Sequence, residues 1–117
     1  MKKPNLKAKL DRVFSEYIRL RDTAGHTKDG YFRCISCGQI KPYSQADCGH
    51  YIGRQHMATR YNEINCNAQC RFCNRFNEGL KGSYRQGLVQ KYGKRTGSRF
   101  YEMFNRIGFT NEDYRKR

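Results

Sequence analysis

The apolar residues near the start of the chain recur at intervals of three and four. They are Leu6, Leu10, Val13, Tyr17 and Leu20. This spacing predicts an amphipathic helix over residues 5–24, which ends at the Ala24–Gly25 pair. Lysine and arginine side chains cover much of the remaining helix surface. They can be solvated, or they can contact a phosphate backbone.

The middle of the chain predicts two short strands bounded by turn residues. The first follows the turn in "TKDGYFRC" and ends at Cys34, and the second lies in "QADCGHYIG", residues 45–53. Residues 53–69 show no clear period. We therefore expect a loop rich in polar and basic side chains there, and such loops often carry function.

The last third of the chain predicts helices separated by glycines. Their expected ranges are residues 70–78, 83–93 and 98–108. We expect one domain over residues 1–117, with an N-terminal helix at 5–24, a core at 31–80 and C-terminal helices at 83–117.

The composition limits the core and indicates a class of partner. Hydrophobic residues make up 37% of the 117 residues and the mean hydropathy is −1.01, so the core is small. A core of this size often depends on a disulfide or a metal. The net charge of +14 predicts a polyanionic partner, and nucleic acid is the class that fits.

The start of the chain, "MKKPNLKAKL", lacks the apolar stretch of a signal peptide, and no segment has the roughly 20 apolar residues of a membrane span. We therefore expect a cytoplasmic protein that does not bind a membrane. Thiols stay reduced in that compartment, so paired cysteines favour a metal site over a disulfide.

Two C-x-x-C pairs, Cys34 with Cys37 and Cys70 with Cys73, are separated by 32 residues. Each pair can offer two thiolates to one tetrahedral ion, so together they predict a closed four-thiolate zinc site. Such an ion has no open position for chemistry, and its binding free energy stabilises the fold. We expect the two remaining cysteines, Cys48 and Cys66, to be small buried thiols.

The residues between and after these pairs follow the order of a known signature. His50 lies in "DCGHY", Asn65 comes five residues before Cys70, and Asn74 directly follows Cys73. This order resembles the HNH endonucleases, and the "CN" ending resembles phage endonuclease VII. "CISCG", "DCGHY", "QCRFCN" and "YRQGLVQKYG" in succession are similar to the NinG (Rap) recombination endonuclease family of phage lambda. The resemblance covers roughly residues 31 to 93.

The resemblance implies a small α+β fold with a zinc-stapled ββα-metal core, treble-clef-like, with a short β-hairpin. It also implies a metal-dependent endonuclease that cuts branched DNA such as Holliday junctions and D-loops. His50 would take the proton from the attacking water, and Asn65 would brace the loop and hold the His50 backbone or ring. Asn74 would offer an oxygen to a catalytic Mg²⁺ or Mn²⁺.

The other ligand of the catalytic cation is open between two residues. Asp47 is the nearest carboxylate to His50, but the two point to opposite faces of a regular strand. A bulge at Cys48–Gly49 would bring them together. Glu78, four residues after Asn74 on the same helical face, is the other candidate.

Several basic side chains are candidates to line a nucleic-acid groove. They are Arg54, His56, Arg60, Arg71 and Arg75. His56 can contact a phosphate, assist the leaving group, or only face solvent. Symmetric junction cleavage needs two active sites, so we expect a homodimer formed through residues 5–22 or the C-terminal helices. The alternative function is a non-catalytic zinc-stabilised module that binds nucleic acid.

Overall fold

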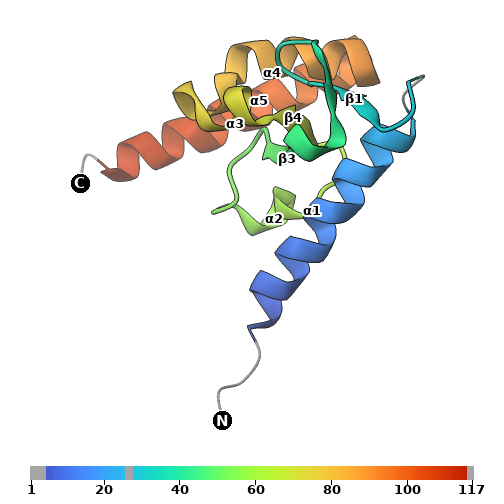
Figure 1. The fold of residues 1–117 in the computed structure, drawn as a ribbon. Coiled ribbons are helices and arrows are strands. Elements are labelled where there is room, and N and C mark those ends of the chain that lie inside the picture. The colour runs from blue at the N-terminus through green and yellow to red at the C-terminus, as the bar shows by residue number, and fades with distance from the viewer. Residues whose placement is uncertain (1–4, 26–27, 116–117) are drawn as a thin grey trace.

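A long helix begins the described chain, short strands fill its middle, and three consecutive helices end it (Figure 1). The computed structural model describes residues 5–25 and 28–115, without the side chains of residues 77–79 and 108–115. Its elements are α1 (Leu6–Ala24), β1 (Tyr31–Arg33), β2 (Ile40–Pro42), a 3-10 turn (Tyr43–Gln45), β3 (Ala46–His50), α2 (Met57–Arg60), β4 (Cys66–Cys70), α3 (Arg71–Arg75), α4 (Asn77–Tyr92) and α5 (Lys94–Arg115). The expected α+β fold is confirmed, and its extent as one domain stays a prediction.

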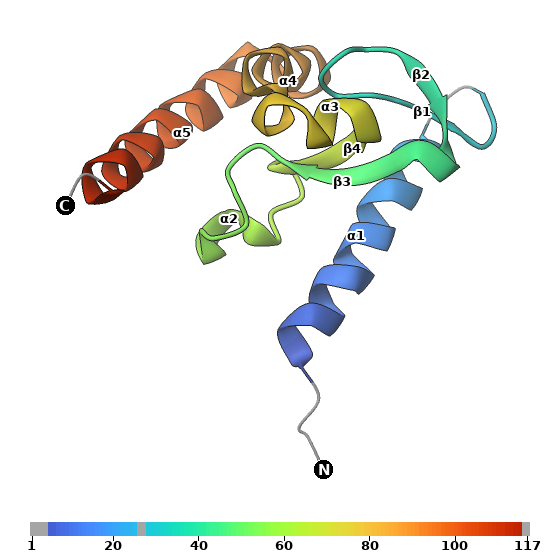
Figure 2. The same ribbon diagram turned by 60° about the vertical axis from the view of Figure 1, so that its left-hand side comes forward.

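Two antiparallel hairpins form the centre of the fold. β1 pairs with β2, and β3 pairs with β4. The β3–β4 register has five consecutive one-to-one partners, from Ala46 opposite Cys70 to His50 opposite Cys66. In Figure 2 this hairpin crosses the middle of the molecule, with α3 and α4 above it and α1 and α2 below. All five residues of β4 are buried.

The apolar interior has two parts. One lies around the hairpins and contains Phe32, Cys34, Ala46, Ala68, Cys70 and Cys73. The other lies between the loop after β3 and helices α4 and α5, and contains Ile35, Tyr51, Ile52, Tyr84, Leu88 and Phe100. Three of the six side chains in the first part are thiols. The stability of that part therefore depends on what the thiols bind.

The end of α1 is attached to β4 and α4 by a polar network. The Asp22 carboxylate accepts hydrogen bonds from the Ala68 N–H (2.7 Å), the Lys91 ammonium (2.8 Å) and the Arg21 guanidinium (2.8 Å). Lys91 also donates to the Asn67 amide oxygen at 2.7 Å. Burial alone would raise the pKa of Asp22. The hydrogen bonds and the positive charges of Arg21 and Lys91 outweigh it and hold this pKa below its ordinary value of 3.8.

The loop expected over residues 53–69 is a wrong prediction, because this segment contains α2 and most of β4. β4 reads Cys-Asn-Ala-Gln-Cys, and its polar side chains are buried together with its apolar ones. The Asn67 amide bonds the Ile64 carbonyl at 2.8 Å, and the Gln69 amide bonds the Ser36 hydroxyl at 2.7 Å. The sequence of β4 does alternate apolar and polar residues, which is a strand signal that the prediction of a loop overlooked. The internal partners explain only why the polar side chains of this strand are buried as well. β2 was also not expected.

The predicted bounds of the middle helices are partly wrong. α3 stops at Arg75 because Phe76 has extended dihedrals (φ −111°, ψ 135°). α4 begins at Asn77, passes Gly79 and Ser83, and ends before Gly93, as expected for that end. Leu80 has a left-handed φ of 50°, so the regular part of α4 starts close to the predicted start at Ser83.

The last helix is longer than predicted. α5 begins at Lys94 and continues through Gly97, Ser98 and Gly108. A Cβ at Gly97 would overlap the Val89 side chain, so this glycine allows α5 to approach α4 closely and does not end a helix. None of the described helices combines the length and apolar character that crossing a bilayer requires.

We predict that Asp22→Asn lowers the free energy of unfolding at pH 7 by about 2–3 kcal/mol, because it leaves a half-buried Lys91 without its charged partner. Urea denaturation measures this change. The control is Asp29→Asn, an exposed carboxylate whose loss should cost less than about 0.5 kcal/mol. Equal effects of the two substitutions would show that the network does not hold α1 in place.

Candidate functional site

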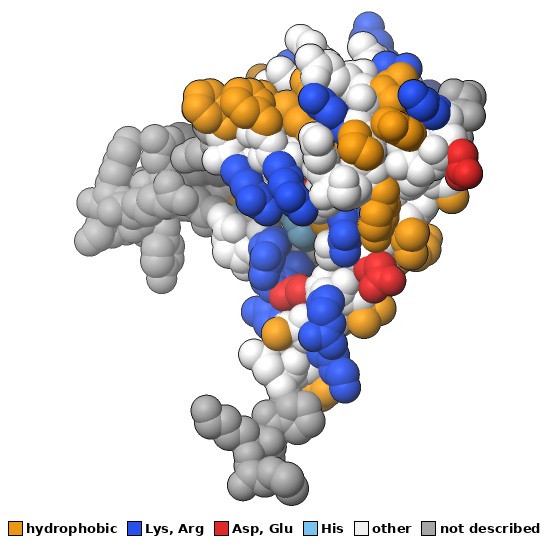
Figure 3. Space-filling view, viewed as in Figure 1, with side chains coloured by type: hydrophobic (Ala, Val, Ile, Leu, Met, Phe, Trp, Pro, Cys, Tyr) orange, Lys and Arg blue, Asp and Glu red, His pale blue; other side chains and the backbone are white. Residues whose placement is uncertain are grey.

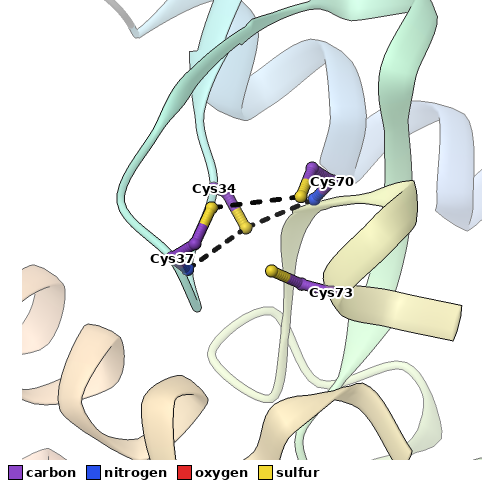
Figure 4. Close-up of side chains that lie close together, drawn as sticks. All are labelled: Cys34, Cys37, Cys70 and Cys73. Atoms are coloured by element: carbon purple, nitrogen blue, oxygen red, sulfur yellow. Dashed lines mark hydrogen bonds between the residues drawn. The ribbon is translucent and has the colours of Figure 1, made fainter. Parts of the chain in front are cut away.

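Four cysteine thiols meet where the turn after β1 faces the junction of β4 and α3 (Figure 4). The sulfur atoms of Cys34, Cys37, Cys70 and Cys73 all lie within 4.8 Å of one another, and those of Cys37 and Cys70 are 4.0 Å apart. Zn–S bonds of about 2.3 Å place tetrahedral sulfur ligands about 3.8 Å apart, so only a small contraction is needed. These four cysteines are positioned to bind a metal such as zinc.

The local backbone favours a thiolate at Cys34. Its sulfur accepts the N–H groups of Cys37 (3.5 Å) and Cys70 (3.3 Å). Burial alone would raise the pKa of Cys34. The N–H donors, with that of Ser36, outweigh burial and lower this pKa below its ordinary value of 9.0. Thiolates are the form that binds zinc, so the donor set matches the ion.

The turn that carries the first thiol pair, Cys34 and Cys37, is attached to the rest of the fold through Ile35. Its N–H donates to the Ala68 carbonyl of β4 at 3.1 Å. A Cβ at Gly87 of α4 would overlap the Ile35 carbonyl oxygen, so glycine is required for this close approach. The two thiol pairs are therefore held in place by β4 and by α4.

His50 ends β3, and its ring is largely buried. The Nε2 atom lies 3.0 Å from the Arg60 carbonyl oxygen. A carbonyl can only accept, so the neutral ring carries its proton on Nε2 and its lone pair on Nδ1. Burial lowers the pKa of His50 below 6.5, and the carbonyls of Arg60 and Cys48, which favour the charged ring, do not offset it. The ring is thus a neutral proton acceptor at pH 7.

Asn65 lies where the resemblance placed the loop brace, and it is completely buried. Its amide oxygen accepts the Ile52 N–H (2.8 Å), and its Nδ2 donates to the carbonyls of Ile52 (3.0 Å) and Thr59 (3.1 Å). The Asn65 carbonyl also accepts the Tyr51 N–H. These bonds close the loop between β3 and β4 just after His50. They reach the backbone next to His50, and the ring itself is held by Arg60.

Asp47 and Asn74 lie side by side. The Asn74 amide donates to Asp47 Oδ2 at 3.0 Å, and Arg75 donates to the same oxygen at 3.2 Å. Arg71 lies 3.8 Å from the other carboxylate oxygen. Both arginine side chains are more than half exposed. The Asp47 side chain itself is 18% exposed, and its oxygens are engaged by Asn74 and the two arginines. A cation would therefore bind the carboxylate by displacing these partners.

The bulge predicted at Cys48–Gly49 is wrong, because the one-to-one register of β3 and β4 leaves no extra residue. The structure gives a different reason for glycine at position 49, because a Cβ there would overlap the Gln69 side chain. The regular strand places Asp47 and His50 on opposite faces of the hairpin. Glu78 lies in α4 and Asn74 in α3, and the extended Phe76 between the two helices contradicts the expected shared helical face. The side chain of Glu78 is outside the described part of the chain.

Among the basic residues expected to line a groove, Arg60 is placed differently. It is 7% exposed, and its guanidinium bonds both carboxylate oxygens of Asp11 in α1. Its function is to attach α2 to α1, which corrects the prediction of a phosphate contact. Arg54 is exposed and lies 3.3 Å from the same carboxylate. His56 occupies the N-cap position of α2 without a capping hydrogen bond from its side chain, and it is partly exposed.

Comparison with known proteins identifies the family of the chain. Residues 2–117 match the family model described as "Bacteriophage Lambda NinG protein". The chain belongs to the NinG family. It is 34% identical over 89 residues to "Protein ninG" of Escherichia phage lambda, which covers 74% of this chain and 42% of that protein. It is 33% identical over 91 residues to "Protein ninG" of Escherichia phage 933W and of Enterobacteria phage VT2-Sa.

This NinG-family chain spans less than half of the length of those relatives, 42% to 44%. No solved structure matches it significantly. The matched region includes both thiol pairs and the hairpin between them.

The structure adds one group that the sequence prediction missed. A nitrogen of His50 and the thiols of Cys48 and Cys66 all lie within 4.8 Å of one another. The signal was present in the spacing, because Cys48 and His50 are two residues apart and share one face of a regular strand.

We predict that Cys70→Ser leaves the chain largely unfolded. Structural zinc contributes about 10–16 kcal/mol, as much as the whole stability of a small domain, about 5–15 kcal/mol. Circular dichroism and metal analysis of protein purified in stoichiometric zinc measure the effect. Asn74→Ala, one residue after Cys73, is the control and should keep both the zinc and the melting temperature. An unchanged melting temperature in Cys70→Ser would contradict the four-thiolate assignment.

Proposed function

We propose that this chain is a metal-dependent endonuclease that hydrolyses phosphodiester bonds in branched DNA, such as Holliday junctions and D-loops. The observation that carries the proposal is on β3. A histidine kept neutral by burial and a carboxylate paired with an asparagine lie on this one strand, next to exposed arginines. In this proposal the β3–β4 hairpin and α3 form the ββα-metal core, treble-clef-like, and the four thiolates hold its structural zinc.

In the proposed reaction, Nδ1 of His50 takes the proton from the attacking water. The Arg60 carbonyl keeps the other proton on Nε2, which fixes the tautomer needed for this role. Asn65 is a positioning residue, because its bonds to Ile52 and Thr59 fix the loop that carries the Arg60 carbonyl. The base is thus held by the loop and not by contact with the cation ligands.

Asp47 and Asn74 are the residues that would hold Mg²⁺ or Mn²⁺. The Asn74 amide now donates to the carboxylate, and a rotation of 180° brings its oxygen to the same place. Carboxylate and amide oxygens are ligands for hard cations. A cation on Asp47 would also release Arg71 and Arg75 to bind phosphate. The bound cation supplies charge neutralisation of the phosphate and of the leaving oxygen.

The placement of Asp47 and His50 on opposite faces sets how the substrate has to bind in this proposal. Asp47 and His50 are about 10 Å apart along the strand. The distance from the base to the cation is roughly 9 Å when the water, the phosphorus and the leaving oxygen lie in line between them. Because the two side chains leave opposite faces of the hairpin, their reacting atoms are farther apart than this backbone distance. In this proposal the phosphodiester wraps around the edge of β3 to reach both groups.

Side chains beside this edge support DNA as the partner. Figure 3 shows lysine and arginine side chains gathered around a histidine on this face of the molecule. Phe72 and Phe76 of α3 are 68% and 56% exposed and stack with ring centroids 5.1 Å apart, next to Arg71 and Arg75. Aromatic faces beside arginines bind unpaired bases, such as those of the displaced strand of a D-loop.

The same surface also favours a second candidate function, a zinc-stabilised module that binds nucleic acid without cutting it. The basic charge and the aromatic pair would serve either function. The neutral His50 and the Asp47–Asn74 pair favour the enzyme, because a module that only binds has no need of a proton acceptor.

We also propose a homodimer formed through α1. The stripe Leu6, Leu10, Val13, Tyr17 and Leu20 is between 48% and 71% exposed. Its alternating spacing of four and three is that of a coiled-coil seam. A second copy of the chain is the occupant, because two active sites are needed to cut a symmetric junction in both strands.

We predict that Val13→Glu converts the dimer into a monomer, because it places a charge in the centre of the seam. Analytical ultracentrifugation measures the mass. The control, Arg12→Ala, removes a side chain from the outer face of the same helix and should leave the dimer intact. A monomeric wild-type protein at tens of micromolar would contradict the proposed interface.

We predict that wild-type protein nicks a labelled four-way junction in Mg²⁺ or Mn²⁺, and that His50→Ala cuts about 10²–10⁴-fold more slowly while still binding. The control is His56→Ala, which removes an imidazole from the following loop and should retain most of the rate. If the wild-type protein binds the junction but never nicks it with any divalent ion, the binding module is the correct function.

The pH profile separates loss of the base from a loss of fold. Burial lowers the pKa of His50, so the active neutral ring persists below pH 6.5. The wild-type rate should therefore be constant near neutral pH and fall only below 6.5. The residual rate of His50→Ala should lack that fall.

A further inference from the structure

The regular register of β3 and β4 collects three soft ligands on one face of the hairpin. Cys48 and His50 alternate onto the same face, and Cys66 is the direct partner of His50 on β4. The two sulfur atoms and one imidazole nitrogen lie within 4.8 Å of one another. The bulge that would have joined His50 to Asp47 would have broken this arrangement.

This group is separate from the four-thiol site. Cys66 begins β4 and Cys70 ends it, so the two clusters are about 13 Å apart along the strand. Cys66 is fully buried, whereas Cys48 and His50 are partly exposed. The cluster is therefore closed on the side of Cys66 and open to solvent on the other side.

Hydrogen-bond partners already hold the side chains of Cys66 and His50 in place. The Arg60 carbonyl accepts from both the Cys66 thiol (3.5 Å) and His50 Nε2 (3.0 Å). The Asn65 amide lies 4.0 Å from the Cys66 sulfur. A carbonyl that holds the remote proton of an imidazole is the usual partner of a metal-binding histidine. Loss of the thiol proton on metal binding leaves that carbonyl to His50 alone.

We propose that Cys48, His50 and Cys66 form a second metal site, which binds a thiophilic divalent cation such as Zn²⁺. Two thiolates and one imidazole are ligands that Zn²⁺ prefers over Mg²⁺. Three protein ligands leave one position for water, so this site is weaker than the four-thiolate site. An ion bound there takes the lone pair of His50. If the proposed function is correct, the ion therefore inhibits hydrolysis.

Metal stoichiometry tests the site without reference to activity. Under reducing conditions with excess Zn²⁺, the wild-type protein should bind two equivalents, and Cys48→Ser and His50→Ala should bind one. His56→Ala, a histidine outside the cluster, should keep two. Cys48→Ser is the main variant, because replacing a partly exposed thiol by a hydroxyl should affect folding little. Its melting temperature checks this. One equivalent in the wild type, or two in Cys48→Ser, overturns the proposal.

Co²⁺ gives an independent readout of the ligands. Thiolate-to-cobalt absorbance scales with the number of Co–S bonds, so the second equivalent should add half the near-ultraviolet absorbance of the first, from two thiolates against four. Cys48→Ser should remove this second increment. An increment that survives in Cys48→Ser would place the second ion elsewhere.

Inhibition connects the site to the proposed function. With Mg²⁺ present, micromolar Zn²⁺ should slow junction cleavage by the wild type at least tenfold and leave Cys48→Ser at its zinc-free rate. If Zn²⁺ instead displaces Mg²⁺ at Asp47 and Asn74, both proteins lose activity equally, and the inhibitory part fails. If no protein cleaves under any condition, the proposed function fails, while the two-equivalent stoichiometry still decides the metal site.

Discussion

The convergence of four thiols is the constraint on which the rest of this structure depends. Three of the six side chains in the core around the hairpins are zinc-ligand candidates. Cys34 and Cys37 follow β1, whereas Cys70 and Cys73 join β4 to α3. An ion held by all four fixes the end of β4, and with it the register that orients β3. It also fixes the start of α3, so that Asn74 points to Asp47.

The hairpin divides chemistry between its two faces. Asp47 meets Asn74 and two arginines on one side, and His50 meets Cys48, Cys66 and the Arg60 carbonyl on the other. Hard oxygen ligands and soft sulfur and nitrogen ligands are thereby kept apart on the same short strand. In this account the base can be reached by a phosphate across the strand edge, and it can also be captured by a thiophilic ion. The same geometry would thus serve both the proposed catalysis and its inhibition.

Local patterns predicted much of this fold. The spacing of Leu6 to Leu20 indicated α1, and the paired C-x-x-C motifs predicted which four thiols would meet. β4 alternates apolar and polar residues, so its strand could have been predicted from the sequence. The burial of both its faces could not, because Asn67 and Gln69 are buried through hydrogen bonds to distant residues. Gly97 looked like a break and is instead a close contact between two helices. Arg60 looked like a phosphate contact because its partner, Asp11, is far away in the sequence.

The most direct test of the division between zinc and catalytic cation is anomalous diffraction from a crystal grown in Mn²⁺. The account predicts a peak at the zinc edge among the four cysteines and a peak at the manganese edge between Asp47 and Asn74. Manganese bound elsewhere, with neither of these side chains as a ligand, would contradict the account.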